Sequence, residues 1–268
     1  MIDEGKKNVL GLLVNAIDYD AATESILAAA CVQRPFIASA LAVHGVMCGF
    51  DDLVHKFRLN HFNLVTPDGQ PVRWAMWVTG QANLPDRVYG PFLTLRVCER
   101  AAAEGLSIFL FGASEPTLTK LVTALRERFP TLKIAGQRPS RFRQITEAER
   151  DDDVQCICAS GANLVMVGLG CPRQEVWAYE MRERLGRPIL AVGAAFDFLG
   201  GTQAMAPAWM QRAGLEWLFR LIHEPARLWR RYLILNPRFC FALLRQCLRF
   251  GRFDPKDCRE PAEELRFG

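Results

Sequence analysis

Short apolar runs alternate with longer helical patterns along most of this chain, and this alternation limits the folds open to it. Seven runs have the character of strands, at residues 10–17, 35–42, 62–66, 106–112, 132–136, 163–170 and 187–196. Segments with helical periodicity lie between them, at residues 21–33, 43–57, 71–80, 91–105, 115–129, 146–161 and 172–186. The runs are apolar on both faces, which is typical of strands covered by helices on both sides. The pattern predicts an α/β fold with a mostly parallel sheet flanked by helices.

The alternation stops near residue 205, and the composition changes there. We therefore predict an α/β domain at residues 1–205, a helical appendage at 206–252 and a polar tail at 253–268. Between Pro207 and Arg252 the chain has nine arginines, no lysine and two glutamates, although its net charge is only +4. Proline interrupts helices, so Pro225 and Pro237 predict three short helices in the appendage.

The appendage mixes arginines with large apolar side chains, a combination typical of helices that lie in a membrane interface. We expect the arginines at 227, 230 and 231 to share one side of a helix. No charge-free apolar run reaches the roughly 18–20 residues that a membrane span needs. The predicted partner is an anionic membrane surface. Nucleic acid is excluded, because a wide apolar face has nothing to bury against in a duplex groove. A helical hairpin packed on the core remains an alternative, and exposed apolar surface could favour a homo-oligomer.

The cysteines and the N-terminus contain no metal-binding or targeting pattern. The chain has nine cysteines, but no C-x-x-C pair and no histidine at zinc-ligand spacing. The D-x-D pairs at Asp18/Asp20 and Asp151/Asp153 are expected to start helices. We predict no metal, no signal peptide, and buried structural cysteines in a reducing cytoplasm.

Ligands of open α/β sheets bind at the carboxyl ends of the strands, so the residues that follow each run are candidates. Asp68 follows the third run in a Pro-Asp-Gly turn, where it could serve turn formation alone or act as a general base. Gly112 closes the fourth run ahead of a helix whose N-terminus would face the cleft and could bind an anion.

The last two runs are followed by loops that would let a ligand approach the backbone. Gly168 and Gly170 precede a helix whose first turn carries Arg173 and Gln174, which could meet a diphosphate or sugar hydroxyls. The third glycine of a dinucleotide fingerprint is replaced by Arg173. After the seventh run, small residues lead to Asp197, which could cap a helix or hold a ribose hydroxyl.

These segments together resemble the WecG/TagA/CpsF family of bacterial glycosyltransferases (glycosyltransferase family 26). The likeness is carried, in the family's order, by "TPDGQPVRW", "RVYGP", "IFLFGAS", "FPTLKIAG", "LVMVGLGCPRQE", "VGAAFDFLGGT", "APAWMQRAGLEWLFRLIHEPARLWRRY" and "NPRF". These blocks cover roughly residues 60–240, and "TPDG-x-P" with "RVYGP" is typical of the exopolysaccharide branch.

The resemblance implies a Rossmann-like core and an inverting transferase at the inner face of the plasma membrane, which needs no metal and no cofactor. The enzyme would move a sugar from a UDP-sugar to a polyprenyl-diphosphate-linked saccharide. The resemblance also implies that Asp68 is the base and that three arginines bind a diphosphate, namely Arg220, Arg227 and Arg230. The implied substrate-binding residues are Ser39, Gly112, Gly168, Gly170, Arg173, Gln174, Glu175, Gly193, Phe196 and Asp197.

The chain departs from the family pattern at several positions. Many members have Asn-Ala before the Asp-Gly, where this chain has Thr66-Pro67. Early in the sequence, many members have a Thr-x-Asn motif, where this chain has Ser39-x-Leu41. Many members also have an arginine directly before the Ala-Pro, where this chain has Met205. One contact to an anionic group is therefore absent or is supplied from elsewhere. A nucleotide-sugar oxidoreductase or epimerase that uses NAD and a non-catalytic membrane adaptor are the alternatives to a transferase.

Overall fold

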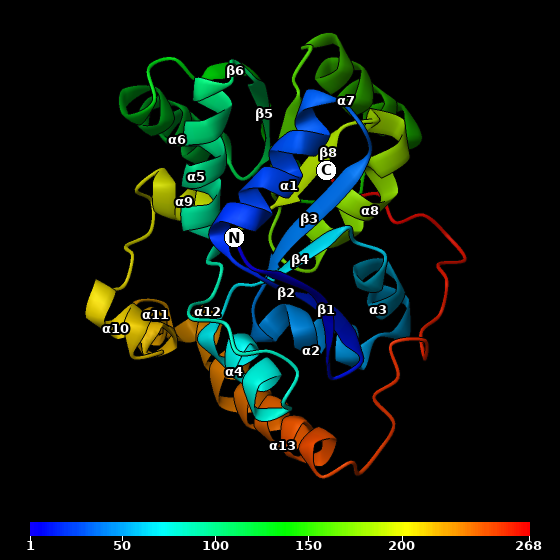
Figure 1. Cartoon of the computed structure of the whole chain (residues 1–268). Coiled ribbons are helices and arrows are strands. Elements are labelled where there is room, and N and C mark those ends of the chain that lie inside the picture. Colours follow the sequence, from blue (N-terminus) through cyan, green and yellow to red (C-terminus); the bar gives the residue numbers. More distant parts are fainter.

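A computed structural model describes all residues 1–268, and a six-stranded parallel sheet forms its centre (Figure 1). The strand order is β4-β3-β8-β7-β5-β6, and every neighbouring pair runs parallel. The strands are β3 (Phe36–Leu41), β4 (Leu64–Pro67), β5 (Ser107–Gly112), β6 (Lys133–Arg138), β7 (Leu164–Gly168) and β8 (Pro188–Ala191). The predicted α/β fold is confirmed.

Both faces of the sheet are buried under helices, as the apolar runs predicted. Along β5, Phe109 and Phe111 belong to one core cluster and Ile108 and Leu110 to the other, because successive side chains point to opposite faces. The first cluster is completed by α2 (Val43–Asp51), α3 (Leu53–Asn60), α4 (Gln70–Val78), α7 (Glu147–Ala159) and α8 (Arg173–Leu185). The second is completed by α1 (Tyr19–Cys31), α5 (Gly90–Ala103), α6 (Glu115–Arg128) and α9 (Ala195–Leu199).

The first predicted strand lies outside the parallel sheet. It is β2 (Leu12–Ile17), and it pairs antiparallel with β1 (Asp3–Val9), a strand that the sequence analysis missed because it is mostly polar. The two residues between them, Leu10 and Gly11, have φ of 55° and 86°. Positive φ at both central positions is the geometry of a two-residue hairpin turn, which directs β2 back along β1.

Two predicted boundaries also differ from the structure. The helix expected at 43–57 is divided into α2 and α3 at Asp52, whose carboxylate accepts hydrogen bonds from the backbone N–H groups of Val54 and His55 and so starts a new helix. The strand expected at 187–196 ends at Ala191, and the chain then turns into α9.

The C-terminal part is helical, as predicted, but its breaks differ from those expected. Its elements are α10 (Ala208–Arg212), α11 (Glu216–His223), α12 (Pro225–Arg230), the π-helical turn η1 (Arg231–Leu235) and α13 (Asn236–Cys247). A break that was not predicted separates α10 from α11 around Gly214, whose φ is 72°. The break at Pro225 is confirmed, whereas the one at Pro237 is wrong, because the backbone stays helical from Arg231 through Asn236. The wider π turn lies directly before Pro237, where the proline has no N–H to donate. None of the helices is both long and apolar enough to span a bilayer.

The C-terminal residues return to the rest of the protein. Gln246 of α13 accepts a hydrogen bond from the backbone N–H of Leu10 at 3.0 Å and donates one to the carbonyl of Asn8 at 3.0 Å. Beyond α13, Lys56 Nζ donates to the carbonyl of Asp257 at 2.9 Å. The final residues cross the surface in extended form (Figure 1).

Removing the aromatic ring of Phe239 should destabilise the protein, because this residue of α13 is only 2% exposed within the first core cluster. Truncating a buried phenylalanine to alanine costs about 3–5 kcal/mol, so we expect Phe239→Ala to lower the free energy of unfolding by that amount in urea titrations. Phe241→Ala is the matched control, since Phe241 is 64% exposed on the same helix. Equal losses in the two variants would show that α13 is not anchored through Phe239.

Candidate active site

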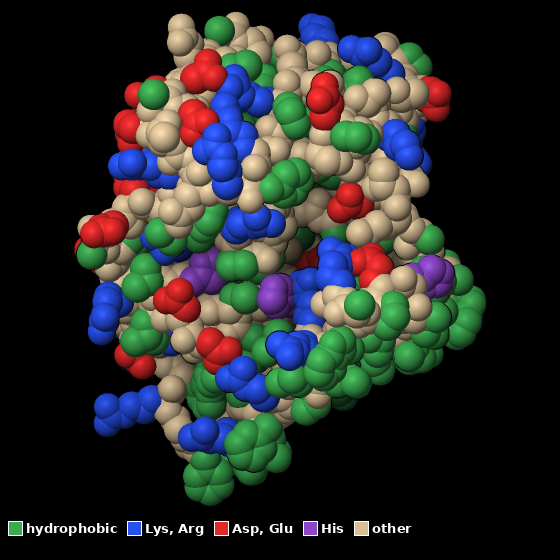
Figure 2. All heavy atoms as spheres, turned by 180° about the vertical axis from the view of Figure 1, so that it is seen from behind, with side chains coloured by type: hydrophobic (Ala, Val, Ile, Leu, Met, Phe, Trp, Pro, Cys, Tyr) green, Lys and Arg blue, Asp and Glu red, His purple; other side chains and the backbone are tan.

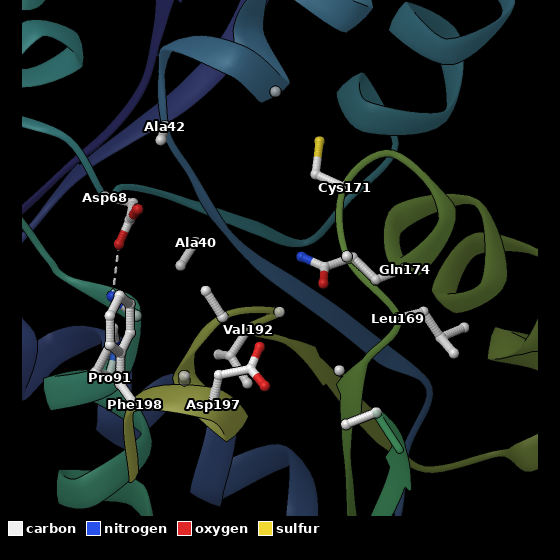
Figure 3. A pocket seen from close by; sticks show the side chains of 18 of the residues that line it. Ala40, Ala42, Asp68, Pro91, Leu169, Cys171, Gln174, Val192, Asp197 and Phe198 are labelled. Carbon is white, nitrogen blue, oxygen red and sulfur yellow. Dashed lines mark hydrogen bonds between the residues drawn. The ribbon is translucent and has the colours of Figure 1, made fainter. Parts of the chain in front are cut away.

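The main cavity of the protein lies at the carboxyl ends of the parallel strands (Figure 3). It has a volume of about 420 Å³. Residues that end or follow strands β3, β4, β5, β7 and β8 line it: Ala40 to Ala42, Asp68, Ala113, Ser114, Gly168 to Gly170, Val192 and Gly193. The strand-end rule therefore placed the cavity correctly.

Asp68 is held at the wall of this cavity by the ends of two other elements. Its backbone N–H donates to the carbonyl of Leu41, and its Oδ1 accepts a hydrogen bond of 2.6 Å from the backbone N–H of Gly90, the first residue of α5. A side chain at Gly90 would crowd this contact, because a Cβ there would lie 3.3 Å from that of Ala40 and 3.5 Å from the carboxylate. The chain thus places one oxygen of Asp68 on a helix N-terminus and leaves the carboxylate facing the cavity.

Burial raises the pKa of Asp68 to about 6, while the positive charge of Arg87 and the N–H of Gly90 act in the opposite direction. A carboxyl group with this pKa is ionised at neutral pH and still has substantial proton affinity. Both properties suit a general base.

Three residues near Asp68 were missed as site residues, although two of them lie in the quoted "RVYGP" segment. Arg87 forms a buried ion pair of 2.6 Å with Glu216 at the start of α11, and its guanidinium carbon lies 4.2 Å from the ring centre of Tyr89. The hydroxyl of Tyr89 is buried close to Glu216, and burial together with the negative charge of Glu216 raises its pKa, so it remains a protonated hydrogen-bond donor. Tyr89 and Glu216 both line the cavity.

The glycines after β5 and β7 shape the floor of the cavity. A Cβ on Gly168 would lie 2.6 Å from the ring of Phe196, and one on Gly112 would lie 2.9 Å from the backbone of Gly168. Gly112 and Phe196 were expected to bind substrate, but neither lines the cavity. Both lie behind Gly168. Gly170 lines the cavity and has a φ of 77°, a conformation that favours glycine.

A buried polar group lies opposite Asp68, at the start of α8. Glu175 Oε1 accepts hydrogen bonds from Ser39 Oγ at 3.0 Å and from Gln174 Nε2 at 2.8 Å. The second oxygen of Glu175 and the amide oxygen of Gln174 are buried without partners. A Cβ on Gly193 would lie 2.6 Å from that amide oxygen. Gln174, Glu175 and Gly193 line the cavity while Ser39 supports them from β3, and unpaired polar atoms at a cavity wall are available to a ligand.

The arginines that line the cavity are Arg173, Arg220, Arg227 and Arg231. Arg230 is not among them: its guanidinium carbon lies over the ring of its neighbour Trp229, at 5.3 Å. The expectation that 227, 230 and 231 share one side is therefore wrong, and Arg231, one helical turn after Arg227, takes the position expected of Arg230. Arg220 lies over the ring of Phe198, and its Nε is buried without a partner.

The acidic candidates have different surroundings. Asp197 lines the cavity from α9, and its Oδ1 accepts a hydrogen bond of 3.2 Å from Thr202 Oγ1. Figure 3 shows its carboxylate directed into the same space as Asp68 and Gln174. Of the D-x-D residues, Asp18 caps α1, as expected, and Asp153 is buried in ion pairs with Arg138 and Arg141.

A second, smaller cavity of about 100 Å³ reaches Asp68 from the side of the C-terminal helices. It shares Ala42, Asp68, Glu216, Arg220 and Arg231 with the main cavity. Its other lining residues include His44, Trp217, Tyr232 and Asn236. Asp68 therefore lies where two cavities meet, with guanidinium groups on the appendage side and glycine-rich loops on the sheet side. This arrangement can hold two substrates, one of them anionic, on either side of the Asp68 carboxylate.

Comparisons with known proteins identify the family of this chain. Residues 7–252 match the family described as "Glycosyl transferase WecG/TagA/CpsF family". The chain is 27% identical over 208 residues to N-acetylglucosaminyldiphosphoundecaprenol N-acetyl-beta-D-mannosaminyltransferase of Bacillus subtilis (strain 168), which covers 77% of this chain and 78% of that protein. It is 28% identical over 188 residues to the protein of the same name from Bacillus spizizenii (strain W23), with 70% of each chain covered. Because the family match spans most of its length, the chain belongs to the WecG/TagA/CpsF family of glycosyltransferases.

Proposed function

We propose that this glycosyltransferase moves an N-acetylhexosamine-type or related hexose unit from a UDP-sugar to a saccharide linked to polyprenyl diphosphate, in exopolysaccharide or other cell-surface polysaccharide synthesis. The observation that carries the proposal is the position of Asp68 between a large cavity and a second one lined by arginines. The relatives named above are mannosaminyltransferases for a lipid-linked acceptor, which supports this substrate class. Because the family is one of glycosyltransferases, we prefer sugar transfer to the NAD-dependent oxidoreductase and membrane-adaptor functions considered above.

The proposed reaction is a single displacement. Asp68 takes the proton of an acceptor hydroxyl, and the oxygen attacks the anomeric carbon from the face opposite UDP. The bond between that carbon and the diphosphate oxygen breaks, and UDP departs with the electron pair, which inverts the anomeric configuration. Charge develops on the diphosphate, where Arg220, Arg227 and Arg231 can form charge-assisted hydrogen bonds.

The donor is proposed to occupy the sheet side of the main cavity. There Gly168 and Gly170 let a ligand approach the backbone, and the unpaired oxygens of Gln174 and Glu175 can accept hydrogen bonds from sugar or ribose hydroxyls. The acceptor would then approach Asp68 through the smaller cavity. This orientation places the lipid end of the acceptor toward the C-terminal helices.

The experiment that tests this function is a transfer assay with the full chain. A panel of UDP-sugars is offered with a synthetic polyprenyl-diphosphate N-acetylglucosamine, and products are separated by mass and examined by NMR. We expect one donor to give a β-linked disaccharide on the lipid. Consumption of a UDP-sugar only in the absence of the lipid acceptor, or an α-linkage in the product, would contradict the proposal.

The C-terminal helices and α4 expose a large set of apolar side chains, which we call the apolar face. Its members are Trp74, Trp77, Val78, Trp209, Ile222, Trp229, Leu233, Ile234, Phe241, Leu244, Leu248 and Phe250. Hydrophobic side chains gather along the lower part of the molecule in Figure 2, where α4 and α10 to α13 lie. Exposed arginines accompany them, at Arg212, Arg230 and Arg245 on the same helices and at Arg249 just after α13. We propose that the apolar face docks on an anionic membrane surface, peripherally, where lipid-linked acceptors are found.

A charge introduced into the apolar face should weaken membrane binding. We expect Leu233→Asp to lower the partition onto vesicles containing anionic phospholipid by roughly 10-fold or more, because burying a leucine side chain contributes about 1.5–3 kcal/mol. Co-sedimentation measures the bound fraction. Val32→Asp is the control, since Val32 is 67% exposed at the end of α1, away from the apolar face, and Leu233 is 58% exposed. Equal losses in both variants would refute docking through the apolar face.

A further inference from the structure

Three potential metal ligands from two separate segments meet at the wall between the two cavities. His44 and Cys48 lie one turn apart on α2, and Cys171 lies in the loop between β7 and α8. One ligand atom of each residue lies within 4.8 Å of the others. His44 and Cys48 are four residues apart on one helix, so the expectation that no histidine lies at zinc-ligand spacing is wrong. Cys171 is far from both in the sequence and is brought to them only by the packing of α2 against the β7–α8 loop.

We propose that His44, Cys48 and Cys171 form a three-ligand site for a thiophilic divalent transition ion such as Zn²⁺. The distances fit such an ion: Cys48 Sγ lies 3.8 Å from Nε2 and 3.9 Å from Nδ1 of His44. With tetrahedral angles and the usual bond lengths to zinc, a sulfur and a nitrogen ligand stand roughly 3.6 Å apart and two sulfurs roughly 3.8 Å apart. Small side-chain rotations therefore suffice to close the site.

The surroundings leave room for a fourth ligand. Cys171 lines the main cavity and His44 the smaller one, so a bound ion would face the space in which substrates are proposed to meet. Nearby, Glu175 Oε2 and both ring nitrogens of His55 are buried without hydrogen-bond partners. Three protein ligands with one open position are typical of zinc sites that bind water or substrate, whereas purely structural sites use four.

The proposed ion would fix the loop that carries Gly170, Cys171 and Arg173 against α2. Binding involves no oxidation, since each thiol that is still protonated releases its proton to solvent as its sulfur coordinates the metal. His44 lines the smaller cavity together with Asp68, Arg220 and Arg231, but none of these three residues is a ligand of the proposed ion. The existence of the metal site can therefore be tested without measuring sugar transfer.

The test is a Co²⁺ titration of the full chain after treatment with reductant and chelator, because Co²⁺ bound to thiolates absorbs strongly in the near ultraviolet. We expect one Co²⁺ per chain with sulfur-to-cobalt charge-transfer absorption, displacement of Co²⁺ by Zn²⁺, and a Zn²⁺-dependent rise in Tm. Cys48→Ser and Cys171→Ser should each lower Co²⁺ affinity by more than the roughly 10–100-fold typical of a lost outer-shell partner. His44→Ala should weaken binding while retaining the charge-transfer absorption.

The matched control is Cys240→Ser, which removes an exposed thiol of α13 and should leave the titration unchanged. Unchanged Tm values of the metal-free variants would show that Cys48→Ser and Cys171→Ser still fold. Absence of charge-transfer absorption, or equal Co²⁺ binding by Cys48→Ser and the wild type, would overturn the proposal. A mass lower by two hydrogens under air, with a Cys48–Cys171 disulfide in peptide maps and no metal uptake after reduction, would overturn it as well.

Discussion

Asp68→Asn is expected to lower kcat for sugar transfer by about 10²–10⁴-fold, the usual contribution of a general base. The substitution keeps the size of the side chain and an oxygen that can accept the hydrogen bond from Gly90, so the cavity should keep its shape. Steady-state transfer assays give kcat, and calorimetric titration with UDP should give a Kd close to that of the wild type. Asp20→Asn, at an exposed ion pair with Arg96, is the control. Wild-type turnover in Asp68→Asn would refute the assignment of the base.

The pH dependence gives an independent check on the same residue. Asp68, the proposed base, can accept a proton only when ionised, and its pKa is raised to about 6, so kcat/KM should be level above that pH and fall as the pH decreases through it. The limiting slope should be tenfold per pH unit. An acidic limb near the ordinary aspartate pKa of about 4 would mean that the titrating base is another group, because kcat/KM reports ionisations of the free enzyme.

Arg231→Ala is expected to lower kcat/KM by about 10²–10³-fold, because it removes a cation from the position proposed for the leaving diphosphate. Its neighbour Arg230 provides a closely matched comparison, since it lies on the same helix and outside the cavity lining. Arg230→Ala should retain activity within a few-fold in detergent, although it should weaken vesicle binding. Comparing the two variants at saturating acceptor, and again with the acceptor in vesicles, separates the two effects.

The opposite ranking would be equally informative. If Arg230→Ala lost activity in detergent and Arg231→Ala did not, the residue assignment made from the family resemblance would hold, and the helix would have to rotate when substrate binds. Arg220→Ala should behave as Arg231→Ala does, because Arg220 lines both cavities.

Much of the fold follows from periodicity that the sequence displays openly. Runs such as 106–112 contain consecutive apolar residues (Ile-Phe-Leu-Phe at 108–111), and only a sheet covered on both faces buries residues like Phe109 and Leu110 together. The strand-end rule then placed Asp68, Gly168 and Gly193 at one edge without any knowledge of the strand order. Hydrophobic periodicity failed to predict β1, because this strand is charged and mostly exposed, and nothing in its composition distinguishes it from a loop.

The parts of the site that sequence reasoning missed depend on contacts between distant segments. Arg87 becomes relevant because Glu216, more than a hundred residues later, pairs with it beside Asp68. The choice between Arg230 and Arg231 is set by a π turn and by the ring of Trp229, and helical spacing alone cannot resolve it. The cluster of His44, Cys48 and Cys171 depends on how a loop packs against a helix, which residue spacing does not encode.

The buried pair of Arg87 and Glu216 has a consequence for chimaeras. The negative charge of Glu216 helps to raise the pKa of Asp68, while Arg87 lowers it. A chimaera that took its last helices from a relative with a neutral residue at position 216 would leave Arg87 uncompensated beside the base. The acidic limb of its kcat/KM profile should then move to lower pH even if every residue around the sugar were unchanged. The proton affinity of Asp68 is therefore a joint property of two regions that can be exchanged only together.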